Sequence, residues 1–163
     1  MLKPSAPDRA WIARHIPQQG SMCLLDGVEA WDEQHIRCRA VTHRAPGNPL
    51  RAFGRLGAAC GIEYAAQAMA VHGALLAPTG NTAARVGYLV SVRDTQLHVP
   101  RLDDIATDLE VCATSIMRGG NNILYRFSVT AAGILLLQGR ATIVIDAGLI
   151  PPLTAETRTG EAP

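Results

Sequence analysis

Glu63 stands in the middle of residues 57–76, a segment that is otherwise almost entirely apolar. The segment has helical length and is apolar on every side, which is typical of a helix buried all round. A carboxylate in such a place must be neutralised, paired or hydrogen-bonded. Gln67 lies one helical turn later on the same face, where its amide could hold and orient the Glu63 carboxylate. Because buried acids with shifted pKa values are common general acids, we expect Glu63 to take part in chemistry.

Other interpretations of this helix remain open. Glu63 could be a structural acid paired with an arginine, and Gln67 a buried amide without a further role. His72 is nine positions from Glu63 and therefore on the opposite face, so we expect a satisfied or partly exposed helix histidine. Cys60 lies three residues before Glu63, but no basic group stands beside it in the sequence to activate a thiolate.

Composition narrows the classes of protein that the chain could belong to. The 163 residues, 48% of them hydrophobic, suit one domain with a sizeable core. A formal net charge of +1 and few aromatic residues argue against nucleic-acid binding. The polar residues inside 57–76 argue against a membrane span, and residues 1–9 lack the apolar core of a signal peptide. Four scattered cysteines predict neither a metal site nor disulfides, and we expect a cytoplasmic protein without a cofactor: Cys23, Cys38, Cys60 and Cys112.

The pattern along the chain predicts strands, one buried helix and then a run of antiparallel strands. Proline and glycine mark residues 43–56 as a loop. The elements expected are a helical turn at 11–15, strands at 23–31 and 35–42, the helix at 57–76, and strands at 86–99, 108–117, 123–130 and 134–145. One sheet must then wrap around one helix, an α+β fold. We expect a single domain over residues 1–150 and a flexible polar tail over 151–163.

This plan resembles the hot-dog fold, and three motifs resemble the β-hydroxyacyl-acyl-carrier-protein dehydratases. Residues 16–28 (IPQQGSMCLLDGV) are similar to that family's proline-to-Leu-Leu-Asp segment. Residues 43–49 (HRAPGNP) resemble its histidine loop, with one residue inserted. Residues 63–67 (EYAAQ) resemble its central-helix motif, as in the branch associated with aryl-polyene and polyketide-like pathways. The likeness spans roughly residues 15–147, although residues 50–56 lengthen the loop and Leu56-Gly57-Ala58 replaces the family's Pro-Gly at the helix start.

The resemblance implies dehydration of a 3-hydroxyacyl thioester to a trans-2-enoyl thioester. His43 would be the base, at the mouth of an acyl tunnel, unless it is simply a surface-loop histidine. Glu63 would be the acid, with a pKa raised by burial, or it would bind the hydroxyl through a water, and Gln67 would fix its rotamer. Backbone N–H groups at Gly57 and Ala58 would bind the thioester oxygen at the helix start.

The resemblance also implies partners. The histidine and the acid would come from different protomers, so we expect a homodimer, or a heterodimer with a second hot-dog dehydratase. An acyl carrier protein would deliver the substrate, and the basic loop residues Arg44, Arg51 and Arg55 could meet its acidic surface. Two other functions stay open. A hot-dog thioesterase would need Glu63 but not His43, and a non-catalytic hot-dog subunit would only bind acyl chains or support an active partner.

Overall fold

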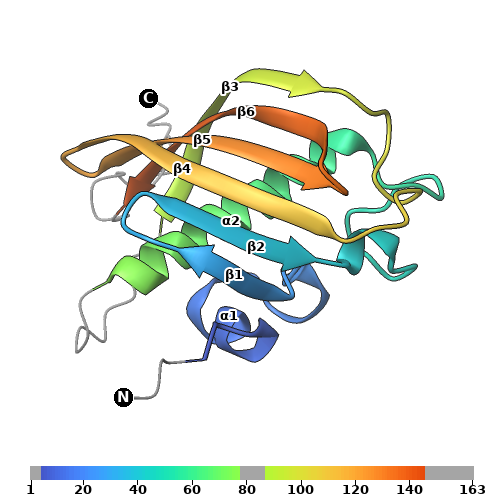
Figure 1. Ribbon diagram of the computed structural model, residues 1–163, viewed down its shortest axis with the longest axis horizontal. Coiled ribbons are helices and arrows are strands. Elements are labelled where there is room, and N and C mark those ends of the chain that lie inside the picture. Colours follow the sequence, from blue (N-terminus) through green and yellow to red (C-terminus); the bar gives the residue numbers. More distant parts are fainter. Residues whose placement is uncertain (1–4, 78–86, 146–163) are drawn as a thin grey trace, which may run out of the picture.

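A six-stranded antiparallel sheet curves around one long helix, α2 (Figure 1). The computed structural model describes residues 5–77 and 87–145, and the strand order in the sheet is β1-β2-β4-β5-β6-β3. The helices are α1 (Arg9–His15) and α2 (Gly61–Leu76), and short 3-10 turns lie at Gly20–Met22, Thr42–Arg44 and Ala58–Cys60. The strands are β1 (Gly27–Trp31), β2 (His35–Ala40), β3 (Gly87–Leu97), β4 (Leu109–Gly119), β5 (Asn122–Ala131) and β6 (Ile134–Ile145). The predicted α+β plan of one sheet around one helix is confirmed.

The alternation of side chains in the strands explains how the sheet covers the helix. In β2 the residues alternate strictly between exposed and buried, and Ile36, Cys38 and Ala40 face the core. Strand β5 and the first half of β4 alternate in a similar way, because successive side chains point to opposite faces of a sheet. Gly120, with φ of 58°, supplies the left-handed residue of the tight turn between β4 and β5. The core of the protein therefore lies between the inner face of the sheet and α2.

The edges of the sheet are β1 and β3. Strand β3 pairs only with β6 among the described strands, and its edge carries exposed apolar residues, including Tyr88, Leu89 and Val90. Strand β6 lies between β5 and β3, so its apolar residues are not at an open edge. An exposed apolar edge is prone to pair with another chain, and β3 is the strand where this applies.

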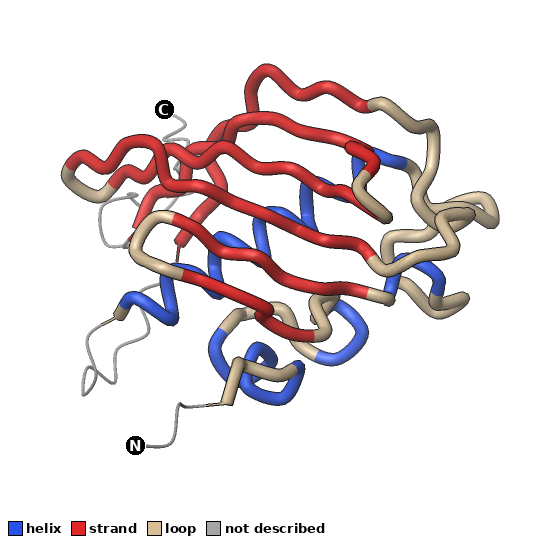
Figure 2. Tube along the Cα trace, viewed as in Figure 1, coloured by secondary structure: helices blue, strands red, loops and turns tan. Residues whose placement is uncertain are grey.

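Helix α2 is less completely buried than its sequence suggests. The side facing the sheet is buried, including Tyr64, Ala68 and His72, whereas Ile62 and Glu63 are only partly buried. The prediction of a helix buried on every side is therefore wrong for this protomer. The sheet covers one side of α2, and the N-terminal segment with α1 crosses another side, as the tube trace shows (Figure 2).

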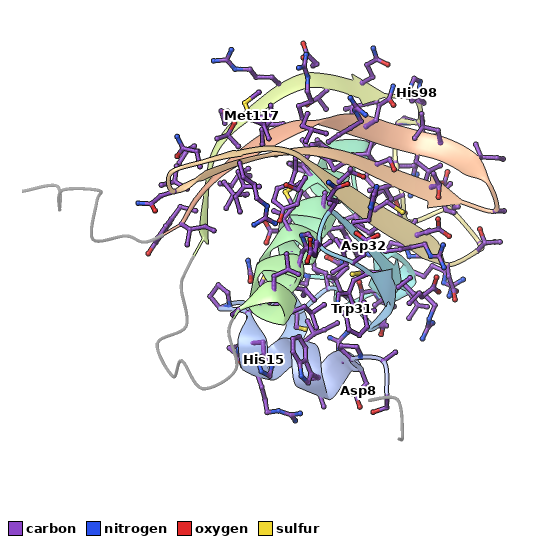
Figure 3. The ribbon with its side chains drawn as sticks, turned by 60° about the vertical axis from the view of Figure 1, so that its left-hand side comes forward. Asp8, His15, Trp31, Asp32, His98 and Met117 are labelled. Carbon is purple, nitrogen blue, oxygen red and sulfur yellow. The ribbon has the colours of Figure 1, made fainter. Side chains whose placement is uncertain are left out.

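The N-terminal region differs in detail from the prediction. Helix α1 starts at Arg9, where the Asp8 side chain accepts a hydrogen bond from the Trp11 N–H at 2.8 Å. Strand β1 begins only at Gly27, because residues 20–26 form a 3-10 turn and an irregular stretch. Figure 3 shows α1, marked by Asp8 and His15, on the side of α2 away from the sheet. Helix α2 ends at Leu76 with Ala77 as its C-cap, which confirms the predicted helix end before residue 78. The tail predicted at residues 151–163 lies outside the described residues.

Candidate active site

The Glu63 carboxylate is held by one of its two oxygens. Oε1 accepts a hydrogen bond from Gln67 Nε2 at 3.1 Å and another from Gln18 Nε2 at 3.3 Å. Oε2 receives no hydrogen bond from the residues that the structure describes. Glu63 as a whole is partly exposed in the protomer. The group is thus oriented by amide donors and keeps one oxygen for a ligand.

Gln67 is itself fixed by backbone groups. Its Nε2 also donates to the Met22 carbonyl at 2.7 Å, and its Oε1 accepts from the Leu24 N–H at 2.9 Å. Gln67 is completely buried, and both its amide nitrogen and its amide oxygen have hydrogen-bond partners, as is usual for buried polar groups. The structure confirms the predicted Glu63–Gln67 contact and adds Gln18, which the sequence analysis did not single out.

His43 occupies the short turn after β2 and is completely buried. Its Nε2 lies 3.1 Å from the Ile105 carbonyl oxygen, which can only accept, so Nε2 carries the proton in the neutral ring. Its Nδ1 is buried and has no hydrogen-bond partner among the described residues. Burial lowers the pKa of His43, while the hydrogen bond to Ile105 acts in the opposite direction. The ring is therefore held neutral with one free lone pair, but it is neither a surface-loop histidine nor open to solvent.

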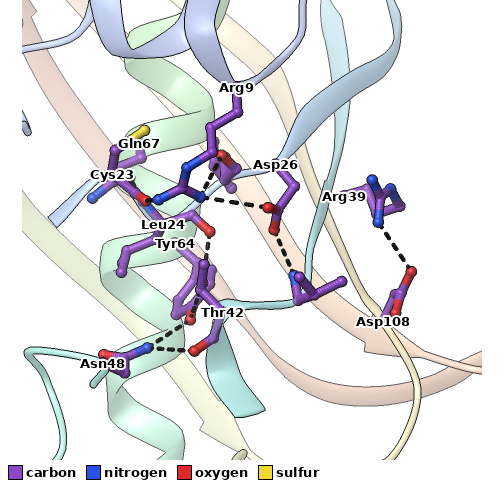
Figure 4. Close-up of polar contacts among 12 residues, drawn as sticks. Arg9, Cys23, Leu24, Asp26, Arg39, Thr42, Asn48, Tyr64, Gln67 and Asp108 are labelled. Carbon is purple, nitrogen blue, oxygen red and sulfur yellow. Dashed lines mark hydrogen bonds and ion pairs between the residues drawn. The ribbon is translucent and has the colours of Figure 1, made fainter. Parts of the chain in front are cut away.

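A buried network links the His43 turn to α2. The Tyr64 hydroxyl lies 2.7 Å from Thr42 Oγ1 and accepts from Asn48 Nδ2 at 3.1 Å. Thr42 Oγ1 donates to the Leu24 carbonyl at 2.6 Å, and Asn48 Nδ2 also donates to the Thr42 carbonyl at 2.9 Å (Figure 4). Thr42 directly precedes His43, and Tyr64 directly follows Glu63. The network fixes the turn that carries the histidine against the helix that carries the acid.

A backbone N–H group at the start of the helix already has a hydrogen-bond partner, contrary to the prediction. The Ala58 N–H donates to the Pro100 carbonyl at 3.2 Å, so the expectation of a free amide at Ala58 is wrong for this protomer. The cause is a bridge between Gly57 and Arg101, which draws residues 100–102 against residues 56–58. Asp103 reinforces this junction by accepting from the Leu56 N–H at 2.9 Å, and its hydrogen bonds with Arg101 hold the Asp103 pKa well below its usual value. Any role for Gly57 and Ala58 in binding a substrate oxygen remains a prediction.

Two other side chains of the region have structural explanations. His72 is buried as a satisfied core histidine, since its Nδ1 lies 2.8 Å from the Tyr125 hydroxyl and its Nε2 donates to the Asp32 carbonyl at 2.8 Å. This confirms its predicted separation from Glu63. Burial raises the pKa of the Cys60 thiol, which disfavours the thiolate that a nucleophile would need.

The three arginines of the loop at 43–56 differ in their hydrogen-bond partners and in their exposure. Arg44 pairs with Asp108 at 2.9 Å, and Arg51 Nε donates to the Ala45 carbonyl at 3.1 Å. Arg55 is exposed and flanks Phe53 at the tip of a tight turn, where Phe53 is fully exposed. Arg55 thus remains the most available cation of this loop for a partner.

Within one protomer the structure brings Glu63 together with Gln67 but does not join Glu63 to His43. No hydrogen bond connects these two residues in the described part of the chain. Residues 5–77 and 87–145 contain no group of three or more potential metal ligands, and no helix there is long and apolar enough to cross a membrane. The site consists of an oriented carboxylate and a separate, buried imidazole.

Comparisons with solved structures identify the fold as the hot-dog class. One chain of the dehydratase heterocomplex ApeI:P from Xenorhabdus doucetiae matches with a TM-score of 0.72 and 20% identity, over 83% of this chain and 90% of that chain. A mutant thioesterase from Pseudomonas aeruginosa matches with a TM-score of 0.62 and 14% identity, over 89% of this chain and 98% of that chain. A thioesterase from Haemophilus influenzae matches with a TM-score of 0.55 and 16% identity, over 74% of this chain and 77% of that chain. At these identities the likeness shows the hot-dog fold alone.

The family follows from the sequence itself. A family model described as ApeP dehydratase matches residues 10–147, and the chain therefore belongs to the ApeP-like dehydratase family. A search among curated proteins finds no match. The predicted fold and the predicted resemblance to hot-dog dehydratases are both confirmed.

Proposed function

We propose that the protein takes part in dehydrating 3-hydroxyacyl thioesters to trans-2-enoyl thioesters, with Glu63 as the acid. The observation that carries this proposal is the Glu63 carboxyl group, held through Oε1 by two amides and free at Oε2, in a member of a dehydratase family. A general acid must present its proton at a fixed position near the leaving oxygen. The arrangement of Glu63 meets this need.

The proposed elimination balances without a cofactor. His43 Nδ1 takes the proton from C2 of the acyl chain, a double bond forms between C2 and C3, and the bond between C3 and its oxygen breaks. The departing hydroxyl takes the proton of Glu63 Oε2 and leaves as water. The proton on His43 then returns to Glu63 and restores both groups. The lowered pKa of His43 supports this role, since a base must be unprotonated at physiological pH.

Geometry favours a site completed by a second chain. No hydrogen bond joins His43 to Glu63 among the described residues of one protomer, and the exposed apolar edge of β3 offers a surface for another subunit. We propose that His43 of one protomer acts with Glu63 of its partner. The substrate would be carried by an acyl carrier protein, with the exposed Arg55 near its acidic surface. Four free cysteines fit a reducing cytoplasm.

The burial of His43 favours a second candidate. Nδ1 has no accessible surface in the protomer, so a substrate could reach it only if a covering segment moved. The ApeI:P structure is a complex of two different dehydratase chains. By analogy, this chain could supply Glu63 to a heterodimer in which the other hot-dog subunit supplies the histidine. His43 would then be a structural residue of its turn.

Mass spectrometry of a 3-hydroxyacyl carrier-protein thioester provides the test. Loss of one water indicates dehydration, whereas release of the free acid indicates a thioesterase. Glu63→Gln should keep the fold and lower dehydration by about a hundredfold or more, the range of a lost general acid. Unchanged turnover in Glu63→Gln would exclude Glu63 as the acid.

Mixing variants separates the two candidates. A heterodimer of His43→Ala and Glu63→Gln chains contains one complete site if the two residues act across the interface. The isolated heterodimer should then recover up to about half of the wild-type turnover, because one of its two sites is intact. If His43 is only structural, a folded His43→Ala protein should support as much dehydration as the wild type when the second hot-dog subunit is present. If the wild-type protein neither dehydrates nor supports dehydration by such a subunit, the proposed function is wrong.

A further inference from the structure

Gln18 approaches Glu63 from outside the helix. It lies between α1 and the Gly20–Met22 turn, and its Nε2 donates to Glu63 Oε1 at 3.3 Å. The neighbouring Gln19 fastens this segment by donating to the carbonyls of Ala13 at 2.7 Å and Ile16 at 3.0 Å. Gln18 therefore belongs to a segment that is held to the end of α1 by side-chain hydrogen bonds of its neighbour.

Gln18 and Gln67 donate hydrogen bonds to the same carboxylate oxygen of Glu63, and they come from different segments of the chain. Gln67 comes from one turn along α2, and Gln18 comes from the segment that crosses the helix. A single donor would leave the carboxyl group free to rotate about its last bond, because that torsion is broad. Two donors on Oε1 restrict this rotation and direct Oε2 away from both amides. When the carboxyl group is protonated, Oε1 is occupied as an acceptor and the proton belongs on Oε2.

The other end of the Gln18 amide argues that stability does not explain this residue. Gln18 Oε1 is buried and has no hydrogen-bond partner among the described residues. A buried acceptor without a partner is destabilising, whereas an apolar side chain of similar size would avoid that cost. Position 18 therefore carries an amide whose nitrogen is used as a donor but whose oxygen has no hydrogen-bond partner among the described residues.

We propose that Gln18 is a positioning residue, which with Gln67 fixes Oε1 of Glu63 and presents Oε2 to the substrate. The inference rests on the proposed function of Glu63 as an acid and extends it to a residue outside the central helix. It holds whether the histidine comes from this chain or from a second subunit, because the grip on Glu63 lies entirely within one protomer.

The test replaces the amide by an apolar side chain. Gln18→Leu removes the donor and the unpaired acceptor together, and Gln18→Ala is the second variant in case leucine does not pack. We expect kcat to fall about tenfold with KM within about twofold, because a loosely held acid spends less time in the reactive geometry. The melting temperature should stay at or slightly above that of the wild type. Gln34→Leu, which changes an exposed glutamine in the turn between β1 and β2, is the matched control and should leave kcat unchanged.

A second readout does not depend on turnover. The side-chain carboxyl ¹³C resonance of Glu63 should move in Gln18→Leu and stay in place in Gln34→Leu. Conversely, Glu63→Gln should move the side-chain amide resonances of both Gln18 and Gln67. An unchanged Glu63 resonance or an unchanged kcat in both Gln18 variants would overturn the inference. A wild-type protein that is inactive both alone and with a second hot-dog subunit would refute the proposed function instead, and the resonances would still decide whether Gln18 holds Glu63.

Discussion

Removing the Tyr64 hydroxyl tests whether the network beneath His43 serves the site. Tyr64→Phe deletes two hydrogen bonds, one with Thr42 and one from Asn48. Neither partner becomes unpaired, because Thr42 Oγ1 still donates to Leu24 and Asn48 Nδ2 still donates to the Thr42 carbonyl. At about 1 kcal/mol net for each hydrogen bond, the expected loss of stability is about 2 kcal/mol. In a domain of this size that lowers the melting temperature by about 4–8 °C.

Tyr125→Phe is the matched control, because its hydroxyl meets α2 at His72, about two turns further along the helix than Tyr64. Among the described residues the Tyr125 hydroxyl makes one hydrogen bond, at 2.8 Å to His72 Nδ1, and this buried nitrogen has no other partner there. Losing it leaves that nitrogen unpaired, at a cost of about 1–3 kcal/mol. The two variants should therefore lose similar stability by different routes, and a thermal melt of each provides the comparison.

Activity should separate the two tyrosines. Only Tyr64 contacts the turn that carries His43, so we expect Tyr64→Phe to reduce kcat by about tenfold or more, since a small misplacement of a catalytic group costs up to about a hundredfold. Tyr125→Phe should retain wild-type kcat at a temperature where both proteins are folded. A larger kcat loss in Tyr125→Phe, or a Tyr64→Phe protein as stable as the wild type, would refute the reasoning. The ¹⁵N resonances of the His43 ring report directly whether its tautomer survives in Tyr64→Phe.

Two further predictions concern stability. Burial lowers the pKa of both His43 and His72, so the unfolded chain binds protons at a higher pH than the folded protein. This contribution to stability is complete above the ordinary histidine pKa of about 6.5 and is lost as the pH falls through the lowered values, which urea midpoints at several pH values will measure. Gly61→Ala places a methyl group 2.6 Å from a Leu137 methyl and should cost about 1–3 kcal/mol, whereas Gly73→Ala meets nothing within 4 Å and should stabilise α2 by about 0.5–1 kcal/mol. Equal melting temperatures for the two glycine variants would contradict the packing argument.

The sequence predicted the elements well where local patterns decide them. Strands β2, β4 and β5 were predictable because their alternation matches the sheet period, and the helix was predictable from one long apolar segment. The start of β1 was placed too early, since apolar residues such as Leu24 and Leu25 are buried without being in a strand. Burial and strand pairing produce the same apolar signal, and the sequence alone does not separate them.

The candidate site was predictable only in part. The four-residue spacing of Glu63 and Gln67 is a local feature of a helix, so their contact could be predicted. The contact of Gln18 with Glu63 joins residues 45 positions apart, and nothing in the local sequence marks it. The occupation of the Ala58 amide by Pro100 has the same origin, because it depends on how residues 100–102 return to the helix start. The burial of His43 likewise depends on its contact with the distant Ile105 carbonyl.

The two halves of the candidate site share one design, which bears on how a complete site can form. Glu63 is anchored through Oε1 and has a free Oε2, and His43 is anchored through Nε2 and has a free Nδ1. Every anchor comes from the same chain, so each group is oriented before a partner or substrate arrives, which lowers the cost of reaching the reactive geometry. No hydrogen bond joins Glu63 to His43 among the described residues of the protomer. This supports the proposal that a second surface completes the site, either a copy of this chain or another hot-dog subunit, and the free Oε2 of Glu63 can serve in both cases.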